Sequence, residues 1–168
     1  MGKCELLKVA TIAVTLAGTT TAGRADTKNP FADAVRAANA RFQDVAVAVK
    51  EGYSPIPCDS APAGGGMGIH YVSGMHLKDK ALDIAHPQAV MYEPQPDGSL
   101  KLIAVEYITF KGPASIGGHL MNFNGAPNSY GLKPFYEIHV WAWKTNRRGT
   151  FADDNPDVSC DHMPMPAK

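Results

Sequence analysis

The chain has 168 residues, with 16 basic and 16 acidic side chains and 45% apolar residues. This length matches one domain, since domains usually contain about 100–200 residues. The balanced charge argues against a protein that holds nucleic acid by bulk electrostatics, because such domains are strongly basic. The apolar content is enough to build a core and excludes a fully disordered chain.

The first 25 residues have the pattern of a secretory signal peptide. Two lysines precede a short apolar run, Val9–Gly18, and Gly23-Arg-Ala25 places small residues where a signal peptidase cuts. A membrane span needs about 20 apolar residues, and this run is about half as long. We therefore expect residues 1–25 to be removed and residues 26–168 to form one periplasmic or secreted domain without a membrane span.

Export changes how the cysteines are interpreted. Cys4 leaves with the predicted signal peptide, so Cys58 and Cys160 remain as a pair in an oxidising compartment. We expect one disulfide that joins the loop after the first helix to the C-terminal tail. The alternative is two free thiols that act as metal ligands or nucleophiles.

The start of the domain predicts one long helix. Asn29-Pro30 is a typical helix start, and Gly52 followed by prolines is a typical end. Between them, apolar residues recur every three or four positions and would form one face of a helix. These residues are Phe31, Val35, Ala38, Phe42, Val45 and Val49.

Four later segments are expected to be extended: Ile69–Val72, Ala89–Glu93, Leu100–Thr109 and Phe135–Trp143. Asp97-Gly98 joins the second and third as a hairpin turn. The stretch Lys111–Pro134 is rich in Gly, Pro, Asn and Ser and is long for a connection, so we interpret it as a lid or rim over a site. The predicted fold class is α+β, with one long N-terminal helix packed on a curved, mainly antiparallel sheet of about four to six strands.

Side-chain alternation places a few ionisable residues in otherwise apolar rows. Residues two apart in a strand share a face. His70 shares its face with Val72, and Glu93 shares its face with Met91. The row around Glu106 is Leu100, Leu102, Ala104 and Ile108, and the row around His139 is Phe135, Glu137, Trp141 and Trp143.

Buried carboxylates and imidazoles cost several kcal/mol unless they are paired, hydrogen-bonded or metal-bound. Two histidines with one or two carboxylates form a ligand set for a divalent metal such as zinc, iron or copper. The predicted ligands are His70, Glu93, Glu106 and His139. The alternative is structural: Glu106 pairs with Arg147 or Lys101, and His139 is a hydrogen-bonded core histidine.

Methionine and histidine also occur close together in the sequence. Soft thioethers beside imidazoles suit copper, whereas methionine is also a common filler of cores. The groups are Met67 with His70, Met75 with His76, His119 with Met121, and His162 with Met163 and Met165.

Several motifs resemble those of an uncharacterised family of exported bacterial proteins. The resemblance covers about residues 31–160 and implies export and a single domain, and it brings no established activity. The motifs are Gly66-Met-Gly-Ile-His-Tyr-Val72, Met91-Tyr-Glu-Pro94, Val105-Glu-Tyr107, His139-Val-Trp-Ala-Trp143 and Asn155-Pro-Asp-Val-Ser-Cys160.

The sequence thus predicts an exported binding protein for a divalent metal or a small ligand. The site should lie in an aromatic-lined pocket. One alternative is a small metal-dependent enzyme, in which Glu106 and His139 would be the acid–base candidates because burial raises the pKa of the first and lowers that of the second. The other is a structural or interaction protein without a metal.

Overall fold

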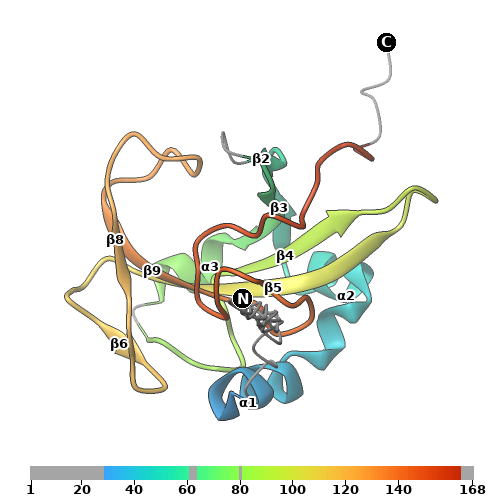
Figure 1. Cartoon of the computed structure of the whole chain (residues 1–168). Helices are drawn as coiled ribbons and strands as arrows, with labels where there is room; N and C mark the ends of the chain where they lie inside the picture. Colours follow the sequence, from blue (N-terminus) through green and yellow to red (C-terminus); the bar gives the residue numbers. More distant parts are fainter. Residues whose placement is uncertain (1–28, 61–63, 80, 164–168) are drawn as a thin grey trace, which may run out of the picture.

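A computed structural model describes residues 29–60, 64–79 and 81–163. Short helices lie on one side of an antiparallel sheet (Figure 1). The predicted signal peptide, residues 1–25, lies outside the described residues. Within those residues, no helix is long and apolar enough to cross a membrane.

The N-terminal helical segment is interrupted twice, so the prediction of one long helix is wrong. It consists of α1 (Pro30–Ala38), the 3-10 turn η1 (Ala40–Gln43) and α2 (Val45–Lys50). Each interruption changes which residues face the sheet. Phe42 is buried as predicted, whereas Val49 is 56% exposed.

Two polar side chains explain the interruptions. The Asn39 amide donates to the carbonyl oxygens of Val35 and Ile84, and it ends α1. Asp44 has an extended backbone and accepts a hydrogen bond from the Ala46 amide, which makes it the N-cap of α2. Asn and Asp side chains that bind the backbone in this way compete with helix continuation.

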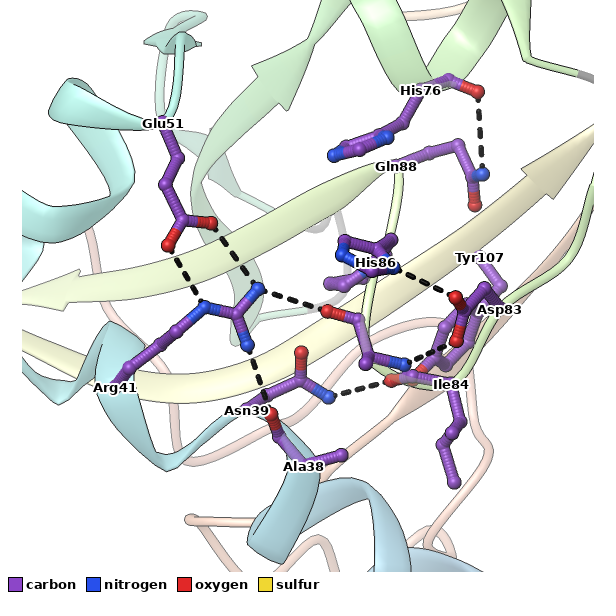
Figure 2. A network of polar contacts seen from close by, with 12 residues as sticks. Ala38, Asn39, Arg41, Glu51, His76, Asp83, Ile84, His86, Gln88 and Tyr107 are labelled. Atoms are coloured by element: carbon purple, nitrogen blue, oxygen red, sulfur yellow. Dashed lines mark hydrogen bonds and ion pairs between the residues drawn. The ribbon is translucent and has the colours of Figure 1, made fainter.

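The interrupted segment is tied to the loop before β4 by a polar network (Figure 2). Arg41 donates to the Glu51 carboxylate at 2.9 and 3.2 Å and to the carbonyl oxygens of Ala38 and Ala85, each at 2.9 Å. Asn39 reaches the neighbouring carbonyl in the same loop. These contacts connect segments about 45 residues apart and fix the helical segment against the sheet.

The main sheet has seven strands, all paired antiparallel, in the order β1-β3-β4-β5-β9-β8, with β2 also paired to β3. This is larger than the expected sheet because short strands line its edges. A separate hairpin, β6–β7, forms inside the predicted lid, and the five-residue helix α3 (Gly74–Lys78) follows β3. The strands are β1 (Tyr53–Pro55), β2 (Asp59–Ser60), β3 (Gly66–Ser73), β4 (Ala89–Pro94), β5 (Leu100–Thr109), β6 (Ser115–Ile116), β7 (His119–Leu120), β8 (Asn122–Asn124) and β9 (Phe135–Val140).

The β4–β5 hairpin confirms the Asp97-Gly98 turn, but a bulge changes the expected side-chain rows. Met91 pairs with Ala104 and Tyr92 pairs with Leu102, so Ile103 is the extra residue in β5. Leu102 therefore packs on the helix side of the sheet and Ala104 on the other. The expected single row from Leu100 to Ile108 is wrong for this reason.

Strand β9 also ends earlier than predicted. Its last residue is Val140, and the chain then turns, with the Ala142 amide donating to the Val140 carbonyl. As a result Trp141 packs on one face of the sheet and Trp143 against the core on the other. The two tryptophans do not share a face, because the period of two holds only while the chain stays extended.

Different segments of the chain pack on the two faces of the sheet. The helices cover one face, and part of the C-terminal segment, residues 141–163, crosses the other (Figure 1), while Trp143 and Phe151 of this segment pack on the helix side. Val158 packs there against Trp141, and Gly66 pairs with Asn155 through two backbone hydrogen bonds. The predicted Cys58–Cys160 disulfide is confirmed and closes a loop with a sequence separation of 102. Such bonds are typical of oxidising settings outside the cytoplasm.

Candidate metal centre

Three of the four predicted ligands meet on the face covered by the C-terminal segment. His70 comes from β3, Glu106 from β5 and His139 from β9, and each offers a ligating atom within 4.8 Å of the other two. His70 Nε2 lies 3.7 Å and His139 Nε2 3.8 Å from Glu106 Oε2. The structure therefore brings together the two histidines and one carboxylate.

Strand register explains this convergence. Glu106 and His139 are direct partners across β5 and β9, so their side chains share a face. His70 is two strands away from Glu106, a separation of about 9.6 Å between backbones. Ala89 of β4 is the partner of Glu106 and carries only a methyl group. That small side chain leaves room for His70 to reach over β4.

A glycine helps to hold the strand that carries His70. Gly68 has φ = +79°, and an added Cβ would lie 2.5 Å from the Tyr92 carbonyl oxygen. A side chain at this position would push β3 away from β4. The Gly-Met-Gly segment is thus explained by close packing of backbone, as expected for a tight entry into the sheet.

The three side chains are buried without hydrogen bonds that satisfy them. His70 and His139 are each 1% exposed and Glu106 is 0% exposed. All four ring nitrogens, and Oε1 of Glu106, lack a hydrogen-bond partner among the described residues. One structural alternative does not occur in the described part of the chain, since Arg147 pairs with Asp157 instead of Glu106.

The spacing of these atoms suits shared ligation better than direct hydrogen bonding. An N–H···O hydrogen bond joins heavy atoms at about 2.9 Å. Ligand atoms around a tetrahedral ion with bonds of about 2.0–2.1 Å lie roughly 3.3 Å apart, and neighbouring ligands of an octahedral ion of that bond length roughly 3.0 Å. The observed 3.7 and 3.8 Å are closest to the tetrahedral case.

Burial moves the pKa values of these groups in opposite directions, as predicted. It raises the pKa of Glu106 well above its usual range, with the neighbouring Glu137 raising it further. It lowers the pKa of His70 to about 3 and also lowers the pKa of His139. Neutral imidazole is the form that binds metal, and the carboxyl must release its proton when an ion binds.

The predicted lid does supply a residue to this site. Tyr130 donates a hydrogen bond to Glu106 Oε2, and its ring lies edge-on to His70 with centroids 5.6 Å apart. The ring centroids of Trp141 and His139 lie 6.4 Å apart, and those of Phe135 and Tyr130 lie 5.7 Å apart. The surroundings are aromatic, as expected.

Glu93, the fourth predicted ligand, lies apart from the other three. Its carboxylate pairs with Lys144 at 2.8 and 2.9 Å and accepts the Ser159 amide at 3.2 Å. Glu93 lies four residues along β4 from Ala89, the partner of Glu106, which is a displacement of about 13 Å along the strand. Glu93 thus fixes the C-terminal segment to β4 in this structure.

The Met–His groups do not converge on one site in the described chain. Met75 is 65% exposed, and the His76 ring lies near His86 at 5.3 Å, on the polar network of Figure 2. His119 packs between Phe31 and Phe151. Met165 lies outside the described residues.

Three residues around the site were not predicted as members of it. Tyr130 and Asp153 come from irregular segments, and only tertiary structure places them. The sequence places Glu137 two residues before His139 in the same row, and this spacing could have identified it as a neighbour of the site. Searches against protein-family models, curated proteins and solved structures found no match to this chain.

Proposed function

We propose that this chain is an exported metal-binding protein whose inner site is formed by His70, Glu106 and His139. The observation that carries the proposal is the cluster of five buried polar atoms without hydrogen-bond partners in the described structure. Each such atom costs about 1–3 kcal/mol if nothing satisfies it. One bound cation would be held by the Glu106 carboxylate and would satisfy one nitrogen of each histidine.

Zinc is the ion that these ligands favour. Its structural sites are tetrahedral and use imidazole and carboxylate ligands. Tyr130 then acts as the neighbour that fixes the Glu106 carboxylate, a common arrangement around metal ligands.

Binding accounts for the geometry better than catalysis does. A catalytic metal keeps a coordination position open to substrate. The three ligands are 0–1% exposed, and Tyr130 closes the remaining side. A hollow of about 780 Å³ beside the β4–β5 hairpin is lined by other residues, among them Asp97 and Lys101.

Export supports the proposal from separate observations. The first 25 residues have the composition of a signal peptide, and the disulfide requires an oxidising setting. A periplasmic or secreted location follows from both. N-terminal sequencing of the protein recovered from outside the cytoplasm tests it, and an intact N-terminus would contradict it.

Elemental analysis tests the metal site directly. The protein is purified without chelators beside Glu106→Gln, which keeps the size of the side chain. We expect the wild type to carry zinc and Glu106→Gln to carry about one equivalent less. His86→Ala is the matched control, because His86 also pairs with a carboxylate but is exposed. Equal metal in wild type and Glu106→Gln, or none on titration, would overturn the proposal.

A further inference from the structure

A second group of ligating side chains lies on the other side of the His139 ring. Glu137, His139 and Asp153 each offer one ligand atom within 4.8 Å of the other two. Glu137 and His139 are two apart in β9 and share a face, and Asp153 comes from the C-terminal segment that crosses it. This group shares only His139 with the inner site.

The two nitrogens of His139 are directed at different carboxylates. Nε2 lies near Glu106, whereas Nδ1 lies 3.9 Å from Asp153 Oδ1. That distance is too long for a hydrogen bond, which requires about 2.9 Å. Nδ1 is thus a buried nitrogen without a hydrogen-bond partner in the described chain, on a ring that is 1% exposed.

Strand β8 holds both carboxylates of this group in place. Asn122 Nδ2 donates to Asp153 Oδ1 at 2.9 Å, and Asn124 Nδ2 donates to Glu137 Oε1 at 3.0 Å. The two asparagines are two apart in one strand and so act from the same face. Hydrogen bonds that orient carboxylates in this way are typical of metal ligands, and they leave lone pairs free for an ion.

The outer group is open to solvent on one side. The Asp153 side chain is 60% exposed, whereas Glu137 and His139 are buried. An ion could therefore reach this group without any movement of the lid. The inner site, with every ligand at 0–1% exposure, has no such access.

We propose that Glu137, His139 and Asp153 bind a second divalent first-row metal ion, through Nδ1 of His139. One imidazole with two carboxylates suits zinc or manganese, and water completes the coordination from the solvent side. When both sites are filled, His139 would bridge the two ions as an imidazolate, with one nitrogen lone pair directed to each ion, and the single N–H proton of the neutral ring would pass to solvent. The second site goes beyond the proposed function, and the total of two ions expected below rests on both sites.

Zinc titration of the metal-free full-length protein tests the second site. Stoichiometry is measured calorimetrically and by elemental analysis after desalting, for the wild type and Asp153→Asn. We expect two zinc ions in the wild type and one in Asp153→Asn. Asp157→Asn is the matched control, because Asp157 is also an exposed carboxylate of the C-terminal segment, paired with Arg147, and should leave two.

The possible outcomes separate the two sites. One ion in both wild type and Asp153→Asn, lost in Glu106→Gln, would overturn the second site and leave the inner one. One ion lost in Asp153→Asn but kept in His70→Ala would support the second site and overturn the inner one. If Asp153→Asn still binds as many zinc ions as the wild type, but with lower affinity, the second site is overturned. Asp153 would then only orient His139. Glu137→Gln provides a second variant, with the same expected loss of one ion.

Discussion

The two faces of the sheet differ in whether their buried polar groups have hydrogen-bond partners. On the helix face, three buried tyrosine hydroxyls each donate to a backbone carbonyl oxygen at 2.7–2.8 Å; they belong to Tyr53, Tyr92 and Tyr107. On the opposite face, His70, Glu106 and His139 bring five polar atoms together without partners in the described chain. The other two such atoms, on Asn39 and Trp143, are single and isolated.

This difference is the reason for treating the helix face as a structural core and for proposing a site on the opposite face. A buried hydroxyl with an acceptor adds about 1 kcal/mol to stability, whereas an unsatisfied buried polar atom costs about 1–3 kcal/mol. Several unsatisfied atoms in one place would remove a large part of the free energy of unfolding of a small domain. A ligand that satisfies them explains the cluster, and four experiments test this comparison.

The largest expected effect concerns the cover over the site face. Replacing Cys58 and Cys160 with serine opens a loop of 102 residues and should lower the free energy of unfolding by about 4–5 kcal/mol. Denaturant unfolding of the oxidised wild type and the double variant measures it. Val49→Ser, at an exposed helix position, is the control. An unchanged midpoint in the double variant would show that the disulfide does not hold the cover.

The loss of stability at acid pH should depend on His70. Its pKa is about 3 in the folded protein and 6.5 unfolded, so below pH 6.5 the unfolded chain binds a proton that the folded one does not. Stability therefore falls as pH falls from 6.5 to about 3, by about 4 kcal/mol from this group.

The variant that checks this is His70→Asn, which does not titrate. In chelator, its free energy of unfolding should fall less steeply between pH 6.5 and 3 than that of the wild type. His86→Asn, at an exposed position, should keep the wild-type slope. Parallel curves for wild type and His70→Asn would contradict the burial of a neutral His70.

The effect of Glu106→Gln on the free energy of unfolding should reverse when metal is added. The pKa of Glu106 is raised above 4.5, so as pH rises past 4.5 the unfolded chain loses a proton that the folded chain keeps. In chelator, wild type should therefore lose stability relative to Glu106→Gln over this range. In zinc at 100 times its dissociation constant, wild type should gain about 2.7 kcal/mol and become the more stable of the two. Thermal unfolding that gives the same order in both conditions would argue against metal at Glu106.

The smallest effects come from a matched pair of tyrosine substitutions. Tyr92→Phe leaves the Phe42 carbonyl without its donor and should cost about 1 kcal/mol, with zinc affinity unchanged. Tyr130→Phe removes the donor that fixes Glu106 and should weaken zinc binding about tenfold. Chemical denaturation and zinc titration of both variants measure this. Equal zinc affinity in the two variants would show that the lid does not serve the site.

The sequence alone predicted the parts that depend on local pattern. The alternation of β5 and β9 placed Glu106 and His139 in buried rows, Asp97-Gly98 gave the hairpin, and the cysteine count after export gave the disulfide. The helix prediction was wrong because its apolar spacing continues through Asn39 and Asp44, whose side chains bind the backbone and interrupt the helix.

The tertiary structure decided which of the predicted side chains meet. The register of β4 and β5 placed Glu93 four residues away from the partner of Glu106, and Ala89 in the intervening strand let His70 reach across. Tyr130 and Asp153 came to the site from irregular segments. Alternation is a property of neighbouring residues in one strand, so the sequence shows it directly. Register, strand order and loop path depend on pairing between distant segments, which only the folded chain determines.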